Sequence, residues 1–169
     1  MLSTAGRSRE GRPVSRWARF AVVGIGNTLA GDDGVGIVVA ERLAERWSDR
    51  PEVVVETLPG DLFAVAEMLG TAESFVFVDA IAGDPPGEIR MLTSAQRAFA
   101  ASLHQTDIGT VMQSLQALEL VSPFPEWQVW GITIDPPEEL GEGLSPPVAA
   151  AADELERRIV DHVEALTAR

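Results

Sequence analysis

The chain contains no cysteine and no lysine, and it has only two histidines. Without cysteine it has neither a thiol nucleophile nor a thiolate metal site, and its composition suits the cytoplasm. Because all 13 basic residues are arginine, no lysine is present to form a Schiff base or serve a Walker-type phosphate loop. Any imidazole chemistry must therefore come from His104 or His162. We expect His162 to be structural, since an imidazolium near the end of a final helix suits the helix dipole.

Other classes of protein are excluded by further absences. No apolar run approaches the roughly 20 residues of a membrane span, and no Gly-x-Ser-x-Gly motif indicates a serine hydrolase. The net charge of −13 argues against a nucleic-acid partner. Residues 1–18 contain four arginines but no apolar block, so they are not a signal peptide. We expect a disordered extension there, with a start codon assigned too early as the equal alternative, and a single domain over residues 19–169.

Apolar runs alternate with amphipathic segments along this domain. The pattern predicts strands at residues 18–25, 52–58, 74–79 and 127–134, and a short edge strand at 88–92. It predicts helices at 36–47, 61–69, 94–101, from Thr106 or Asp107 to 118, and from Ser145-Pro146 nearly to the end of the chain. This order predicts a three-layer α/β/α fold with a mostly parallel (mixed), twisted sheet of about five strands and helices on both faces.

A glycine-rich loop after the first predicted strand contains two adjacent acids, Asp32 and Asp33. A helix N-terminus with free N–H groups usually suits an incoming phosphate, which two carboxylates would repel. The loop therefore presents acids to a cation. We expect Asp32 mainly to cap the following helix, and Asp33 to be the stronger candidate for a ligand.

Topology brings further candidate ligands to the same place. Asp79 closes the predicted strand at 74–79, and His104 precedes a predicted helix, so both can reach the carboxyl edge of the sheet near Asp33. Two carboxylates and an imidazole suit nickel, manganese, iron, zinc or cadmium. Taken singly, Asp79 could instead bond loop N–H groups, and His104 could be an ordinary loop histidine.

A dinucleotide-binding domain is an alternative interpretation of the same strand, loop and helix. Gly24 and Gly26 form a Gly-x-Gly pair, and Glu56 ends the second predicted strand, where a ribose-binding acid belongs. The third glycine of the fingerprint is missing, however, and the paired aspartates lie near the phosphate position. This alternative is therefore disfavoured.

Four motifs in order resemble the hydrogenase maturation proteases, the endopeptidases that finish the large subunit of nickel–iron hydrogenases. The first motif is Gly24-Ile-Gly26-Asn27-Thr-Leu-Ala-Gly-Asp32-Asp33-Gly34-Val-Gly36. The second is Val-Asp79-Ala-Ile-Ala-Gly83 with Pro-Gly following, and the third is Ser-Leu-His104. The last comprises Gly-Ile at 131–132 and Gly-Leu-Ser-Pro at 143–146. The resemblance covers residues 19–166.

The resemblance implies a peptidase that cleaves the C-terminal tail from a hydrogenase large-subunit precursor. It also implies that Asp33, Asp79 and His104 bind a divalent metal, while Gly24, Gly26, Asn27, Asp32, Gly34, Gly36 and Gly83 shape the loops. The resemblance further implies that this metal is nickel already inserted in the substrate, for which other divalent metals can substitute. The segment around His104 is not the commonest form, which leaves open which hydrogenase is served.

The same ligands would also serve a non-catalytic, chaperone-like relative that holds the precursor without cutting it. We expect a cytoplasmic protein with no membrane or nucleic-acid partner. The oligomeric state is open, with a monomer favoured over larger assemblies.

Overall fold

The computed structural model describes residues 18–93 and 107–168. The predicted extension, except for Ala18, lies outside these ranges, as do the predicted helix at 94–101 and His104. Ala18 itself is the first residue of a strand.

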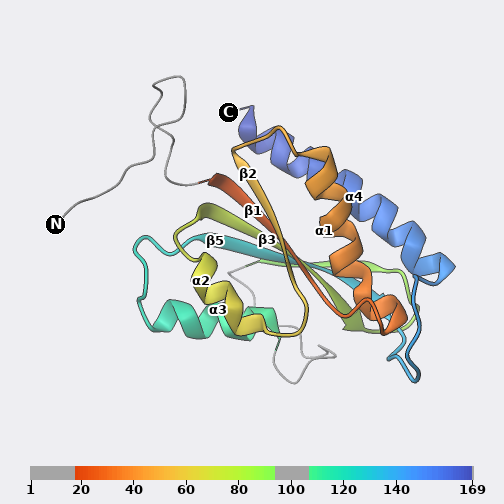
Figure 1. Cartoon of the computed structure of the whole chain (residues 1–169). Coiled ribbons are helices and arrows are strands. Elements are labelled where there is room, and N and C mark those ends of the chain that lie inside the picture. Colours follow the sequence, from red (N-terminus) through yellow and green to blue (C-terminus); the bar gives the residue numbers. More distant parts are fainter. Residues whose placement is uncertain (1–17, 94–106, 169) are drawn as a thin grey trace.

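A five-stranded sheet forms the middle layer (Figure 1). In chain order its strands are β1 (Ala18–Ile25), β2 (Val53–Leu58), β3 (Ala72–Ala82), β4 (Ile89–Thr93) and β5 (Glu126–Ile134). Their order across the sheet is β2-β1-β3-β5-β4, with β4 antiparallel to β5 and all other pairs parallel. The mixed sheet and the short strand at its edge are both confirmed.

Helices cover both faces of the sheet, so the predicted three layers are confirmed (Figure 1). One face packs against α1 (Val35–Arg46) and α4 (Pro146–Thr167). The other packs against the short 3-10 helix η2 (Leu62–Ala64), α2 (Val65–Met68) and α3 (Ile108–Ala117). The side chains of β3 alternate between these cores, with Val76 and Val78 facing α1 and α4, and Phe75 and Phe77 facing α3.

Helix starts agree with the polar residues that precede them. Asp61 caps η2 by accepting a hydrogen bond from the Phe63 N–H, at 3.0 Å. Asp107, rather than Thr106, caps α3 by accepting one from the Thr110 N–H, at 2.9 Å.

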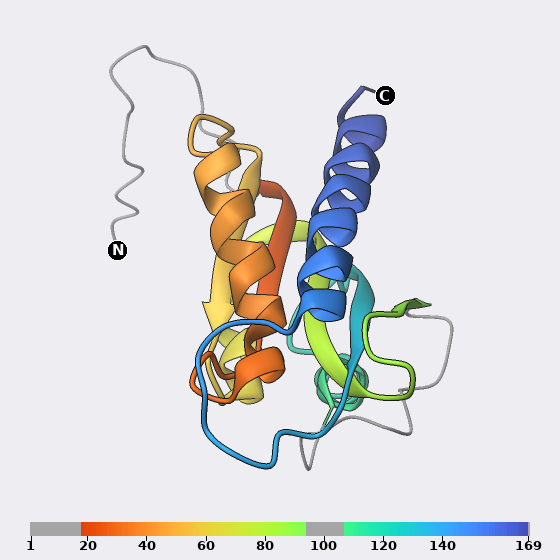
Figure 2. The ribbon, with the colours of Figure 1, turned by 90° about the vertical axis from the view of Figure 1, so that its right-hand side faces the viewer.

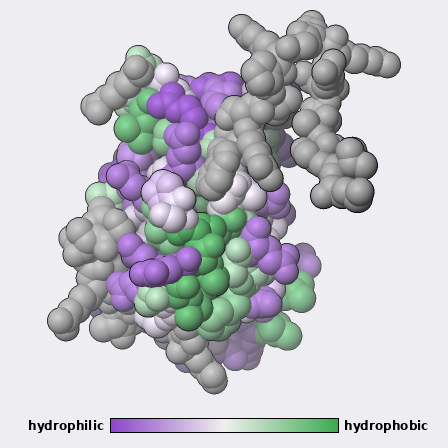
Figure 3. Space-filling view, turned by 90° about the vertical axis from the view of Figure 1, so that its left-hand side faces the viewer, coloured by the Kyte–Doolittle hydropathy of each residue, from purple (hydrophilic) through white to green (hydrophobic). Residues whose placement is uncertain are grey.

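No described helix is long and apolar enough to cross a membrane. The face at the left of Figure 1 carries an apolar area bounded by hydrophilic residues (Figure 3).

The strand β3 (Ala72–Ala82) is longer at both ends than the predicted strand at 74–79, so the end predicted at Asp79 was wrong. Its pairing with β1 ends at Val78, whereas its pairing with β5 continues to Ala82 opposite Ile134. Asp79 therefore does not close the strand. It is the first residue of β3 beyond the residues that pair with β1.

Candidate metal-binding site

The loop between β1 and α1 turns back on itself through a short 3-10 helix, η1 (Gly31–Gly34). Gly26 has a φ of 145°, and a Cβ atom there would lie 2.0 Å from the Asp33 carbonyl oxygen. The Asn27 N–H donates to that same oxygen at 3.3 Å. Its side-chain oxygen accepts from the Leu29 N–H at 3.0 Å. Gly26 and Asn27 thus fix the position of the Asp33 backbone.

The remaining glycines of the motif let α1 approach the sheet closely. A Cβ atom on Gly36 would lie 2.2 Å from the Ile25 carbonyl oxygen and 2.3 Å from that of Val78. One on Gly24 would lie 2.2 Å from the Gly36 carbonyl oxygen, and one on Gly34 would lie 2.7 Å from the Thr28 Cα. The first turn of α1 therefore rests on the ends of both β1 and β3.

This packing places η1, which carries Asp33, in contact with β3, which carries Asp79. Both aspartates are buried, with exposed fractions of 7% and 2%. The Asp79 carboxylate accepts a hydrogen bond from the Ala80 N–H at 2.9 Å. Within the described ranges, the Asp33 carboxylate accepts no hydrogen bond and forms no ion pair. The two acids lie where β1 ends beside β3, the part of such sheets that usually binds ligands.

His104, the third predicted ligand, lies outside the described residues. Alternation along β3 places Asp79 on the same face as Phe75 and Phe77, which is the face covered by α3. His104 precedes the first residue of α3, Ile108, by four positions. Residues 18–93 and 107–168 contain no group of three acids or histidines that could hold a metal ion. The triad therefore stays a prediction that depends on His104.

Asp32 does not cap the helix that follows it, so that prediction was wrong. The N-cap of α1 is Gly34, with no side-chain hydrogen bond. The Asp32 carboxylate instead accepts two hydrogen bonds from Ser145, one from the N–H at 2.6 Å and one from the hydroxyl at 2.7 Å. Ser145 is the N-cap of α4, as predicted, but its hydroxyl bonds Asp32 and makes no cap to its own helix.

A segment that sequence reasoning did not assign to the site crosses η1. This segment, residues 135–145, is the strap. It joins β5 to α4 and passes beside the loop between β1 and α1, which is orange in Figure 2. It forms an isolated bridge between Gly141 and Ala30. The Gly31 N–H donates to the Gly141 carbonyl at 2.6 Å, and the Gly141 N–H donates to the Leu29 carbonyl at 2.9 Å. These backbone bonds leave no sequence signal.

Gly83, one of the residues predicted to shape the loops, packs on Thr133. A Cβ atom at Gly83 would lie 2.7 Å from the Thr133 Cγ2. The buried Thr133 hydroxyl donates to the Pro85 carbonyl and accepts from the Glu88 N–H, both at 2.7 Å. Gly83 therefore shapes the connection between β3 and β4.

His162 has the structural role expected of it, but for a different reason. Burial lowers the pKa of its imidazole, so the neutral ring is favoured over the predicted imidazolium. The ring Nε2 lies 2.6 Å from the Gln128 Nε2 and accepts a hydrogen bond from that amide in the neutral form. The contact joins α4 to β5.

We expect the stability of the folded chain to fall as pH decreases below about 6.5, the value for an unfolded histidine. The folded pKa of His162 lies lower, so in this window the unfolded chain binds the proton more readily. Urea unfolding of wild type and His162→Gln from about pH 7 to pH 5 measures this contribution. The difference in unfolding free energy between the two proteins should shift with pH, and parallel curves would contradict the assignment.

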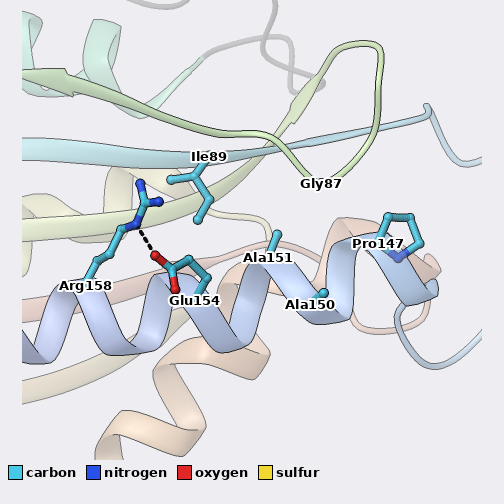
Figure 4. A pocket seen from close by; sticks show the side chains of 7 residues that line it. All are labelled: Gly87, Ile89, Pro147, Ala150, Ala151, Glu154 and Arg158. Carbon is cyan, nitrogen blue, oxygen red and sulfur yellow. Dashed lines mark hydrogen bonds and ion pairs between the residues drawn. The ribbon is translucent and has the colours of Figure 1, made fainter.

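A separate hollow of about 350 Å³ lies between the β3–β4 connection and α4 (Figure 4). Ile89 and Ala151 line it, together with the ion pair between Arg158 Nε and Glu154 Oε1, at 2.7 Å. Hydrogen bonding to Arg158 lowers the pKa of Glu154. None of its lining residues belongs to η1, so it is not part of the aspartate site.

No family model matches the chain. The chain is 27% identical over 146 residues to the hydrogenase expression/formation protein HoxM of Cupriavidus necator, covering 82% of this chain and 71% of HoxM. Its fold is similar to that of the [NiFe] hydrogenase maturation protease HybD from Thermococcus kodakarensis, with a TM-score of 0.66 and 26% identity over 86% of this chain and 98% of HybD.

A second maturation protease from Thermococcus kodakarensis, HycI, gives a TM-score of 0.65 at 25% identity, covering 87% of this chain and 93% of HycI. The maturating endopeptidase HybD of E. coli, at 23% identity and a TM-score of 0.63, adds support for the fold alone over 86% of this chain and 92% of that one. The resemblance predicted from the four motifs is confirmed, and the enzyme class of these relatives is the predicted one, a peptidase.

Proposed function

We propose that this chain, which is similar in sequence and fold to hydrogenase maturation proteins, is an endopeptidase for a large-subunit precursor. It removes the C-terminal tail of the precursor in the cytoplasm, after nickel has been inserted. It recognises the nickel carried by the substrate through Asp33, Asp79 and His104.

The observation that carries this proposal is the Asp33 carboxylate, which belongs to a residue only 7% exposed and has no hydrogen-bond or ion-pair partner among the described residues. Its oxygen atoms are not among the fully buried atoms without a partner, so they stay open to an incoming group. A divalent cation that Asp33 and Asp79 share would balance two negative charges carried by adjoining segments. Asp79 lies on β3 just beyond the residues that pair with β1, and it supplies the second acidic ligand.

The donor set suits a metal that the substrate partly holds. Carboxylate oxygens and one imidazole nitrogen bind nickel, and they also accept other divalent ions. Three protein ligands leave coordination positions for the groups by which the precursor holds its own metal. Shared coordination then contributes binding energy only when the precursor is loaded.

The mass of the precursor after incubation tests the proposed activity. We expect the large subunit to lose its C-terminal tail, and the free tail to be found, when wild-type protein meets nickel-loaded precursor. A non-catalytic holder would bind the precursor and leave its mass unchanged. An intact precursor in a stable complex would therefore contradict the peptidase and favour the holder.

A further inference from the structure

The strap is fixed to the candidate site at two points. Both hydrogen bonds of Ser145 end on Asp32, which is adjacent to the buried Asp33. The bridge from Gly141 to Ala30 attaches the middle of the strap to the beginning of η1. Figure 2 shows the strap following the lower edge of the molecule beside the loop after β1. The strap is therefore a fixed segment beside Asp33, and a partner that binds Asp33 would also contact it.

The strap is acidic and its charges are uncompensated. The strap contains no basic residue. Its four acids are all exposed: Asp135, Glu138, Glu139 and Glu142. None of them forms an ion pair with the described part of the chain. The acids of α4 differ, because Asp153 pairs with Arg42 at 2.7 Å and Glu154 pairs with Arg158 at 2.7 Å. The charge of the strap is thus available to a partner.

Large apolar side chains lie among these acids. Leu140 is 81% exposed, the highest exposure among the large hydrophobic residues that the structure describes, and Leu29 is 58% exposed. The backbone bond from Gly141 to Leu29 brings their two segments together. Exposed leucines on a segment fixed by hydrogen bonds, with charged residues around them, resemble a protein interface, which has an apolar centre and a polar rim.

We propose that the strap, together with Leu29, is the docking surface for the hydrogenase precursor. It takes a segment in which arginine or lysine side chains flank an apolar residue. This inference rests on the proposed function, since it identifies the partner by the site that the strap borders. The basic side chains meet the four acids of the strap, and the apolar residue packs on Leu29 and Leu140.

Charge and position favour this occupant over a second copy of the chain. Two straps facing each other would bring four acids against four, which disfavours self-association. A basic segment has the opposite sign, and attraction at a rim mainly increases the association rate. The strap also borders Asp33 through Asp32, so a partner docked there is close to the proposed nickel ligands.

Steady-state cleavage of nickel-loaded precursor by two variants tests the inference. One is the triple variant E138Q/E139Q/E142Q, and the other is Leu140→Ser. We expect the triple variant to raise KM about tenfold at low salt, with kcat almost unchanged, because rim charges act on encounter. The difference from wild type should largely disappear at about 0.5 M salt, where exposed charges are screened. Leu140→Ser should raise KM at both salt concentrations.

Matched controls separate docking from general effects of charge and exposure. E41Q/E45Q/D49N removes the same charge from exposed positions on and just after α1, and Leu118→Ser changes a leucine that is 64% exposed at the end of α3. Both controls should keep the KM of wild type. An unchanged KM in the strap variants, or an equal rise in the controls, would overturn the docking surface while leaving the peptidase intact.

Two further results distinguish this inference from the proposed function. If wild type binds the precursor without cutting it, the peptidase fails, and the dissociation constant then replaces KM as the test of docking, with the same expected changes. If wild type neither binds nor cuts the precursor, both proposals are overturned. A dimer of wild type that the strap variants dissolve would overturn the docking surface in favour of self-association.

Discussion

Asp33→Asn is expected to lower kcat/KM for nickel-loaded precursor by at least about 100-fold, beyond the 10- to 100-fold typical of losing a partner that only orients a metal ligand. The physical reason is that an amide carries no charge and is a poor ligand for a divalent cation. Circular dichroism and urea unfolding should show a folded protein. The unfolding free energy should stay close to that of wild type, because the Asp33 carboxylate has no hydrogen-bond or ion-pair partner among the described residues to lose.

Asp32→Asn is the matched control, since it makes the identical chemical change at the adjacent residue. The amide oxygen of the substituted side chain can still accept one of the two hydrogen bonds from Ser145. We therefore expect a loss of no more than several-fold, expressed in KM through the position of the strap. Equal losses of activity in the two variants, with both folded, would contradict the division of roles between the two aspartates.

Gly36→Ala is expected to lower the free energy of unfolding by about 3 kcal/mol or more, the upper part of the range for overpacking. The new methyl group would lie 2.2 Å and 2.3 Å from the backbone carbonyl oxygens of Ile25 and Val78. Backbone atoms of two strands cannot move aside as a flexible side chain could, so α1 must shift away from the sheet. That shift also moves η1 and Asp33. Urea unfolding monitored by tryptophan fluorescence measures the change.

Gly141→Ala provides the control for this substitution. A Cβ atom at Gly141 meets nothing within 4 Å, and its φ is not in the left-handed region. The variant should unfold at nearly the same urea concentration as wild type, with a gain of no more than about 1 kcal/mol from the less flexible unfolded chain. A small effect at Gly36 comparable to that at Gly141 would contradict the close packing of α1.

Much of the fold was predictable because its strands are apolar runs and its helices begin at recognisable residues. β1 was predicted with the observed bounds, and Asp61 and Asp107 cap helices as expected. The length of β3 was not predictable, because residues 80–82 are ordered by pairing with β5 and not by local preference. Such pairing depends on a neighbour that is distant in sequence.

The candidate site was predictable in part. Adjacent acids in a glycine-rich loop identified the segment, and parallel topology brought Asp79 to it. The roles within the pair were harder to assign, because the partner of Asp32 is Ser145, 113 residues away. Similarly, His162 lies near a helix end, where a cation is favourable, but burial lowers the pKa of its imidazole and favours the neutral ring. Tertiary contacts decide both cases.

The central claim, that the substrate's nickel is what the site recognises, is tested most directly by comparing nickel-loaded and nickel-free precursor. Titrations of both forms with wild type and His104→Ala measure the preference, with mass spectrometry of the products. Wild type should bind and cut the loaded form with a preference of at least about 100-fold, since losing shared coordination costs several kcal/mol and each 1.4 kcal/mol is tenfold. His104→Ala should abolish that preference. Equal binding and cutting of both forms by wild type would contradict the claim.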